Sequence, residues 1–240
     1  MEHRDRLWPG GYTFLYDDGL FRPSTDTFLL GAFPRLRRGM TVCELGAGTG
    51  LLSLLLLARE PELTVTGVEL QPQACALFRR TAEENGLQGR MHCLEGDLRQ
   101  GLLPPGRFRL AVANPPYFPP DAGAVAPDAA RRTARAETDC TLAQLCAAAA
   151  RALTWGGSFC LVHRPDRLAD VLEELRRVRL EPKRLRFVHH TAAAPPSLFL
   201  LEARLGGGVG LTVEPPLLLH GPDGGETEDV RRAYFRDKEE

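Results

Sequence analysis

Lysine is almost absent from this chain of 240 residues, and positive charge is not in excess. The chain has two lysines, Lys183 and Lys238; its other basic side chains are arginine or histidine, and the formal net charge is −1. Proteins dedicated to nucleic acids are often strongly basic. The overall charge therefore gives no support for a nucleic-acid partner, although a local basic face would be sufficient to bind one.

The sequence also lacks a long apolar run. Its longest, residues 51–58, is interrupted by Ser53 and is far shorter than the roughly 20 residues that a membrane-spanning helix needs. The first eight residues are polar and charged, unlike a signal peptide. We therefore expect a cytoplasmic protein with no membrane partner.

Closely spaced metal ligands are missing as well. No two cysteines form a Cys-x-x-Cys pair, most of them lie in apolar stretches, and the six histidines are scattered. The six cysteines are Cys43, Cys75, Cys93, Cys140, Cys146 and Cys160. This pattern is typical of reduced, buried thiols and predicts no metal site. The cysteine and charge patterns favour a monomer or a weak homodimer.

Strand and helix patterns alternate along the chain from residue 41 onward. Strands are predicted at 41–45, 63–69, 91–94, 108–113 and 158–162. Helices are predicted at 51–59, 72–85, 141–155 and 166–178, the last capped by Asp166. Such alternation is typical of an α/β fold with an open, mostly parallel sheet and helices on both faces.

Two final strands, 184–189 and 197–205, follow each other without a helix between them. A connection of about seven residues is too short for a parallel crossover, so we expect an antiparallel pair. The core of this single domain is then residues 41–205. Residues 1–40 are an N-terminal segment that we expect to cover a cofactor site, and residues 206–240 are a C-terminal extension whose end we expect to be mobile.

A glycine motif follows the first predicted strand, in Glu44-Leu45-Gly46-Ala47-Gly48-Thr49-Gly50. Gly46, Gly48 and Gly50 let the backbone turn sharply and approach a ligand. Ligands of open α/β sheets bind at the carboxyl ends of the strands. The spacing is not the Gly-x-Gly-x-x-Gly of dinucleotide-binding proteins. Glu44 would repel a pyrophosphate and suits a cationic ligand.

Acidic residues also end the next two predicted strands. Glu69, followed by Leu70, lies about twenty residues further on, where an acid can accept both hydroxyls of a ribose. Asp97, preceded by Gly96, is placed to accept a hydrogen bond from an adenine amine. Three acids after three successive strands favour a ligand site over simple turns and helix caps.

These motifs resemble the class I S-adenosylmethionine-dependent methyltransferases over residues 41–205. The resemblance implies a Rossmann-like fold with S-adenosyl-L-methionine as the cofactor. Glu44 would then lie near the sulfonium or the ammonium of that cofactor. Its predicted binding residues are Thr25, Asp26, Glu44, Gly46, Gly48, Gly50, Glu69, Leu70, Gly96, Asp97 and Asn114.

Asn114-Pro115-Pro116-Tyr117 directly follows the fourth predicted strand and resembles the motif of methyltransferases that act on planar exocyclic nitrogens. An adenine amine is a poor nucleophile because its lone pair is delocalised into the ring. The Asn114 oxygen and the Pro115 carbonyl can each accept one N–H, which frees the lone pair to attack. Pro115 and Pro116 stiffen the loop, and Tyr117 can stack on the base. No strong general base is needed.

The N-terminal segment 18–33 resembles the bacterial valine-tRNA adenine-N6 methyltransferase family. In that family a Thr-Asp step lies close to the cofactor, and Thr25 and Asp26 match it. The alternative is that either residue caps the helix expected at 27–33. The sequence Glu214-Pro215-Pro216-Leu217 also resembles the family, whereas the acidic end, 237–240, departs from it.

Arginines after the catalytic motif resemble basic residues that face the RNA in that family. They are Arg131, Arg132 and Arg135, within a long loop that we expect beside the site. Arg35, Arg37 and Arg38 are candidates to extend the same face. The alternative for both groups is a solvated, charged surface.

The same Asn-Pro-Pro-Tyr motif serves adenine in DNA, bases in RNA and glutamine amides. Only about forty residues precede the glycine motif, where release-factor methyltransferases carry an added helical domain. We therefore predict an enzyme that methylates the exocyclic amine of an adenine in tRNA, by resemblance in the anticodon loop of a valine tRNA. Ribosomal RNA, a protein glutamine, a small amine, or a non-catalytic role as a cofactor-binding subunit stay open as alternatives.

Overall fold

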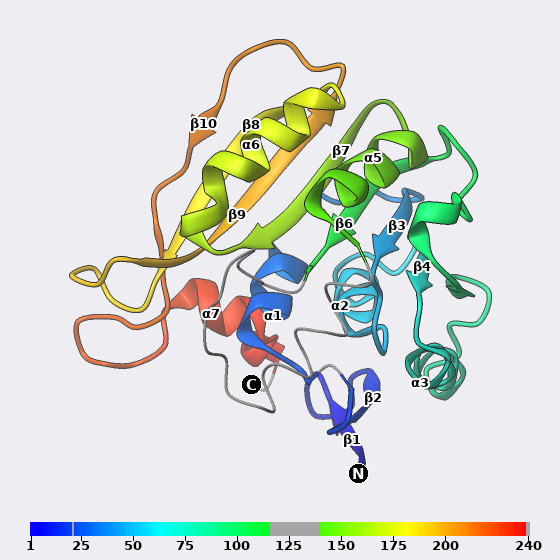
Figure 1. Ribbon diagram of the computed structural model, residues 1–240. Coiled ribbons are helices and arrows are strands. Elements are labelled where there is room, and N and C mark those ends of the chain that lie inside the picture. The colour runs from blue at the N-terminus through cyan, green and yellow to red at the C-terminus, as the bar shows by residue number, and fades with distance from the viewer. Residues whose placement is uncertain (21, 116–139, 239–240) are drawn as a thin grey trace, which may run out of the picture.

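The computed structural model describes residues 1–20, 22–115 and 140–238. Within these residues, one sheet of nine strands forms the centre of the molecule (Figure 1). Its strands are β3 (Thr41–Leu45), β4 (Thr64–Glu69), β5 (Met91–Glu95), β6 (Phe108–Ala113), β7 (Leu153–His163), β8 (Leu180–His189), β9 (Pro196–Leu205), β10 (Thr212–Val213) and β11 (Leu217–Leu218).

The order of the strands is β10-β8-β9-β7-β6-β3-β4-β5, with β11 paired to β8 beyond this path. The five strands from β5 to β7 are parallel. Strand β9 runs antiparallel to both β7 and β8. The predicted open, mostly parallel sheet with a final antiparallel pair is confirmed. All parallel strands therefore end at the same edge of the sheet, where the site is expected.

Helices cover both faces of the sheet (Figure 1). They are α1 (Thr25–Ala32), α2 (Leu51–Arg59), α3 (Pro72–Glu84), α5 (Leu142–Ala152), α6 (Leu168–Arg177) and α7 (Glu228–Ala233), with short 3-10 turns η1 (Leu98–Gln100), η2 (Pro165–Arg167) and η3 (Arg236–Lys238). Val42 belongs to the core under α1, α2 and α3, whereas its neighbour Cys43 belongs to the core under α5 and α6. Successive side chains of a strand point to opposite faces of the sheet, so neighbouring residues of β3 enter different cores. None of the helices in the described ranges has the length and apolarity to cross a membrane.

Two predicted helix boundaries are wrong. Helix α5 ends at Ala152 instead of residue 155, because Leu153 already pairs with Phe108 of β6 and the Thr154 hydroxyl donates to the Phe108 carbonyl at 3.2 Å. Asp166 does not cap α6; it lies in η2, and α6 begins at Leu168.

The N-terminal segment begins with a hairpin that the sequence analysis missed, β1 (Glu2–Arg6) and β2 (Thr13–Asp17). It packs on α3 rather than on the edge of the large sheet. The Asn85 amide accepts from the Thr13 N–H at 2.8 Å and donates to the Thr13 carbonyl at 2.6 Å. Within the predicted segment 1–40, α1 is the element whose side chain contacts Asn114.

Part of the C-terminal extension, around α7, packs against α1. The Tyr234 ring, directly after α7, stacks on Phe28 of α1 with 4.2 Å between the ring centroids. Its hydroxyl donates to the Thr25 Oγ1 at 3.0 Å. Val230 and Phe235 are buried in the same core. The apolar side chains of this segment therefore hold it against the core, although the segment also contains many charged residues.

Tyr234→Phe tests this contact between the two ends of the chain. It removes the hydrogen bond to Thr25 and keeps the stacked ring, so we expect the free energy of unfolding to fall by about 1 kcal/mol. Tyr16→Phe is the matched control, because the Tyr16 hydroxyl bonds to no residue that the structure describes. Urea unfolding measures both, and equal stabilities of the two variants would contradict the hydrogen bond from Tyr234 to Thr25.

Candidate functional site

The glycine loop turns at the carboxyl end of β3 and is tied to the end of β4. The Gly46 and Ala47 N–H groups both donate to the Val68 carbonyl at 3.0 Å. The Gly48 N–H donates to the Glu69 Oε2 at 2.7 Å. Gly46, Gly48 and Gly50 all have positive φ, of 74°, 52° and 87°. The three predicted glycines therefore form one left-handed turn that other residues adopt only with strain.

Gly46 and Gly50 serve this loop in different ways. A Cβ on Gly50 would lie 2.6 Å from the Phe78 Cδ2 and 2.7 Å from the Met91 Cε, so Gly50 is needed for packing. A Cβ on Gly46 would meet no atom within 4 Å. Gly46 thus faces open space, where a ligand can approach the backbone.

Glu69 connects three loops at the end of β4. Its Oε1 accepts from the Gln71 N–H at 2.9 Å, its Oε2 holds Gly48, and its carbonyl accepts from the Gly96 N–H at 2.8 Å. Each carboxylate oxygen can accept more than one hydrogen bond, so Glu69 can still accept hydroxyl groups. The next residue, Leu70, is 40% exposed and offers an apolar surface beside it.

Asp97 follows β5 at the same edge and is engaged within its own loop. Its Oδ1 accepts from the Arg99 N–H at 2.9 Å, and the Arg99 guanidinium contacts both carboxylate oxygens. These Arg99 donors lower the pKa of Asp97. Asp97 is thus ionised and placed as predicted, with Arg99 as a partner that the sequence analysis did not identify.

Glu44 is buried and caps the start of α2. Its Oε2 accepts from the Ser53 N–H at 3.0 Å and from the Ser53 hydroxyl. Burial raises the pKa of Glu44 to about 8, against the Ser53 hydrogen bonds, which lower it. Its carboxyl group therefore supports the helix that follows the glycine loop. The expected contact with a cationic ligand stays a prediction.

Asn114 lies directly after β6, next to β3 in the sheet. Its Nδ2 donates to the Thr27 Oγ1 of α1 at 3.0 Å. Thr27 is a functional candidate that the sequence analysis missed. A buried threonine among the apolar residues of α1 was the available signal.

The Thr-Asp step lies in the first turn of α1. The helix begins at Thr25, its N-cap is Ser24, and no side chain caps it, so the capping alternative for Thr25 and Asp26 is not observed. Thr25 accepts the hydrogen bond from Tyr234. Asp26 lines a cavity at the ends of β7 and β9, together with Arg164 and Ser197.

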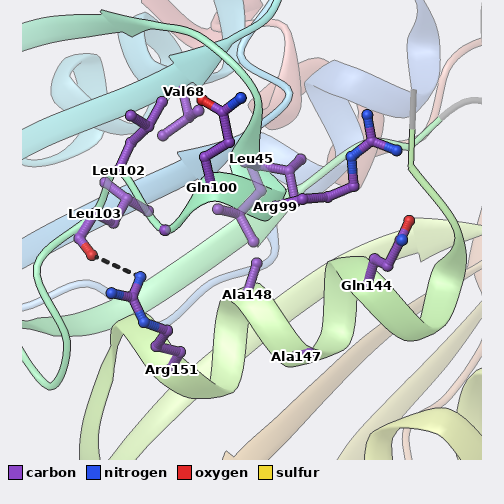
Figure 2. Close-up of a pocket in the computed structure, with 12 residues that line it drawn as sticks. Leu45, Val68, Arg99, Gln100, Leu102, Leu103, Gln144, Ala147, Ala148 and Arg151 are labelled. Atoms are coloured by element: carbon purple, nitrogen blue, oxygen red, sulfur yellow. Dashed lines mark hydrogen bonds between the residues drawn. The ribbon is translucent and has the colours of Figure 1, made fainter. Parts of the chain in front are cut away.

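Two cavities lie along the carboxyl edge of the sheet, one at the ends of β3 and β4 and the other at the end of β7 and the start of β9. The first, about 500 Å³, lies between η1 and α5 over the ends of β3 and β4, and Figure 2 shows Leu45 between these two walls. The second, about 480 Å³, is the one lined by Asp26 and Arg164. Strand β6, which ends directly before Asn114, lies between β3 and β7 in the sheet.

Three predicted arginines within the described residues lie away from this site. Arg35, Arg37 and Arg38 lie between α1 and the start of β3, and Arg38 pairs at 2.6 Å with Glu62, which precedes β4. They are therefore at the amino edge of the sheet, opposite Asn114. A further five predicted residues lie outside the described residues: Pro116, Tyr117, Arg131, Arg132 and Arg135.

Nothing in the described part of the chain suggests a metal centre. Within residues 1–20, 22–115 and 140–238, no three His, Cys, Asp or Glu side chains gather to hold an ion. Four of the six cysteines are buried, namely Cys43, Cys75, Cys146 and Cys160.

The chain matches known proteins over most of its length. The methyltransferase small domain family matches residues 23–182. A tRNA1(Val) (adenine(37)-N6)-methyltransferase of Yersinia enterocolitica is 32% identical over 182 residues, which cover 73% of this chain and 71% of that relative.

Solved structures share the fold. A predicted O-methyltransferase from Agrobacterium tumefaciens has a TM-score of 0.72 at 22% identity, covering 87% of this chain and 96% of that one. A geranyl diphosphate C-methyltransferase from Streptomyces coelicolor, in complex with S-adenosyl-L-homocysteine, has a TM-score of 0.54 at 14% identity, covering 74% of this chain and 75% of that one. The predicted Rossmann-like fold is confirmed.

The raised pKa of Glu44 predicts a pH-dependent stability. Between the ordinary pKa of 4.5 and about 8, the folded protein keeps a proton on Glu44 that the unfolded chain has lost. The free energy of unfolding should therefore fall as the pH rises through this range, by up to about 1.4 kcal/mol per pH unit. Glu44→Gln should remove this component, so urea unfolding of the variant should give a flatter curve than the wild type. Parallel curves would show that Glu44 is already ionised in the folded protein.

Proposed function

We propose that this chain, which belongs to the methyltransferase small domain family, transfers a methyl group from S-adenosyl-L-methionine to the exocyclic amine of an adenine in tRNA. The chain is an S-adenosylmethionine-dependent methyltransferase, as the sequence predicted. The proposal concerns the acceptor and the residues that handle it.

The residues on the β3, β4 and β5 side fit this cofactor. The loop at Gly46 is open on its ligand side, and Glu69 keeps lone pairs for ribose hydroxyls. Asp97 lies after β5 to receive an adenine amine, provided that Arg99 gives up part of its contact. The neighbouring cavity has an apolar floor with arginine and glutamine side chains around it, a lining suited to a flat heteroaromatic ring. When bound, the cofactor supplies an electrophilic methyl group on its sulfonium.

The position of Asn114 is the observation that carries the proposal. It follows β6, which lies between β3 on the cofactor side and β7, whose end borders the second cavity of about 480 Å³. Its amide oxygen can accept one N–H of an adenine amine, and the Pro115 carbonyl is the second predicted acceptor. Both bonds draw the lone pair of the amine out of the ring and direct it toward the cofactor side. No residue needs to act as a strong base.

Two features favour tRNA as the substrate. The relative from Yersinia enterocolitica carries a name that specifies adenine 37 of a valine tRNA, and we extend this assignment to the present chain as a proposal. Arg164, which follows β7, is mostly exposed at the second cavity and suits a phosphate contact. A tRNA substrate also fits the expected cytoplasmic location. Arg35 and Arg38 lie at the opposite edge of the sheet, away from Asn114.

Transfer of radiolabelled methyl from S-adenosylmethionine to unmodified total tRNA tests this function. We expect label in N6-methyladenosine and a loss of at least about a hundredfold in Asn114→Ala, because the amine then loses an acceptor that acts in the transition state. Asn85→Ala is the matched control, since Asn85 is the other asparagine of the chain and holds the β1–β2 hairpin on α3. It should lower stability and keep activity at low temperature.

Parallel reactions with ribosomal RNA, ribosome-associated protein and small amines separate the alternatives. Label that enters protein or a small amine, with none in tRNA, would contradict the tRNA proposal. Undiminished activity of Asn114→Ala would contradict the mechanism and leave the substrate assignment standing.

A further inference from the structure

Thr27 is the polar exception in the buried part of α1. The helix reads Thr-Asp-Thr-Phe-Leu-Leu-Gly-Ala, and residues 27–31 are all buried. Thr27 is only 3% exposed. A hydroxyl in such a position is costly unless it is hydrogen-bonded, so its partners indicate its role.

The partner of Thr27 on the sheet is the amide of Asn114. The Nδ2 of Asn114 lies 3.0 Å from the Thr27 Oγ1 and donates to it. The oxygen and nitrogen of an amide lie on opposite sides of the same carbon. A bond that holds the nitrogen toward α1 therefore directs the oxygen away from α1.

A second hydroxyl lies within hydrogen-bond distance of Thr27 and can set the direction of this bond. The Ser24 Oγ lies 3.2 Å from the Thr27 Oγ1, one helical turn earlier, and the Thr27 N–H donates to the Ser24 carbonyl at 3.1 Å. A threonine hydroxyl has a single hydrogen. If Thr27 gives that hydrogen to Ser24, it faces Asn114 with lone pairs alone and can bind only the N–H end of the amide.

We propose that Thr27 is a positioning residue that sets the orientation of the Asn114 amide, with Ser24 fixing the direction of the Thr27 hydroxyl. This inference rests on the proposed function, in which the Asn114 oxygen accepts an N–H of the target amine. An amide rotated by half a turn would present its own N–H to that amine. It would then repel the group that it has to bind.

The packing of α1 maintains this geometry. Phe28, the next residue, stacks on Tyr234, and Thr25 binds the Tyr234 hydroxyl. Both contacts are made by the C-terminal extension, so α1 is held between the sheet and α7. A small shift of Thr27 would move the amide of Asn114 with it.

Thr27→Val and Thr27→Ser separate a positioning role from a structural one. Valine keeps the shape and removes the hydroxyl, so we expect kcat to fall on the order of tenfold to a hundredfold, with the KM for S-adenosylmethionine changed less than about twofold. Serine keeps the hydroxyl and should restore most of the activity. Thr81→Val is the matched control, because Thr81 is also a buried threonine whose hydroxyl is bonded, at 3.2 Å to the Leu15 N–H, on the side of α3. It should lower stability without lowering kcat.

The orientation of the amide can be read without any substrate. The chain contains two asparagines, so protein labelled with ¹⁵N at asparagine side chains gives two NH₂ signals, from Asn85 and Asn114. In Thr27→Val, the Asn114 signal should shift and its protons should exchange with water at least about fivefold faster, since they lose a buried acceptor. The Asn85 signal serves as the internal reference and should not change.

Three outcomes distinguish the positioning role of Thr27 from the proposed methyl transfer to tRNA. An unchanged Asn114 signal in Thr27→Val, or a Thr27→Ser variant as slow as Thr27→Val, would overturn the role of Thr27. A wild type that transfers no methyl to tRNA would overturn the proposed function, and the amide signal would still decide about Thr27. A shifted signal together with a selective fall in kcat would support both.

Discussion

The carboxyl end of β4 is the point on which the rest of the site depends. The Val68 carbonyl receives two N–H groups of the glycine loop, and Glu69 binds Gly48, Gln71 and Gly96 through three different oxygens. Three segments, the glycine loop, residues 68–71 and the turn at Gly96, therefore meet at one strand end. The short bonds fix the backbone of the glycine loop in its left-handed turn. Without them, Gly46 would not present an open backbone surface to the cofactor.

The two ends of the chain complete the site from the other side. α1 provides Thr27 to Asn114, and residues that follow α7 hold α1 through Phe28 and Thr25. The sheet alone places Asn114 at the end of β6, between β3 on the cofactor side and β7, whose end borders the second cavity. The orientation of its amide, however, comes from the elements outside the sheet. The strands of the sheet thus determine where the Asn114 side chain lies, and the segments outside the sheet determine how its amide is oriented.

The strands and most of the helices could be predicted because their signals are local. β3 and β6 are short apolar runs that stop before a glycine or an asparagine, β4 is a β-branched run that ends at Glu69, and the short connection before β9 predicted the antiparallel pair. The glycine motif, Glu69 and Asp97 were also placed correctly at one edge, because parallel strands must end together. The hairpin β1–β2 and helix α7 escaped prediction. Their stability comes from contacts with α3 and α1, which lie far away in the sequence.

The positions of the site residues along the chain could be predicted, but their hydrogen-bond and ion-pair partners could not. Arg99 binds Asp97, and Ser53 binds Glu44; neither bond has a signature in the sequence. Arg35 and Arg38 appeared suitable for RNA because of their charge. The length of α1 carries them to the opposite edge of the sheet, where Arg38 pairs with Glu62. A group of charged residues in the sequence does not by itself indicate at which edge of the sheet these residues will lie.

Binding of S-adenosylmethionine to Gly46→Ala and Gly39→Ala, measured by titration calorimetry, tests the central claim that the edge at Gly46 holds the cofactor. Both glycines have positive φ, of 74° and 68°, and in both a Cβ would meet no atom within 4 Å. The two variants should therefore lose similar stability, roughly 1–2 kcal/mol. If the account is correct, Gly46→Ala loses at least about tenfold in affinity, because its methyl group enters space that the cofactor needs, whereas Gly39→Ala binds like the wild type. Equal affinities for the two variants would contradict it.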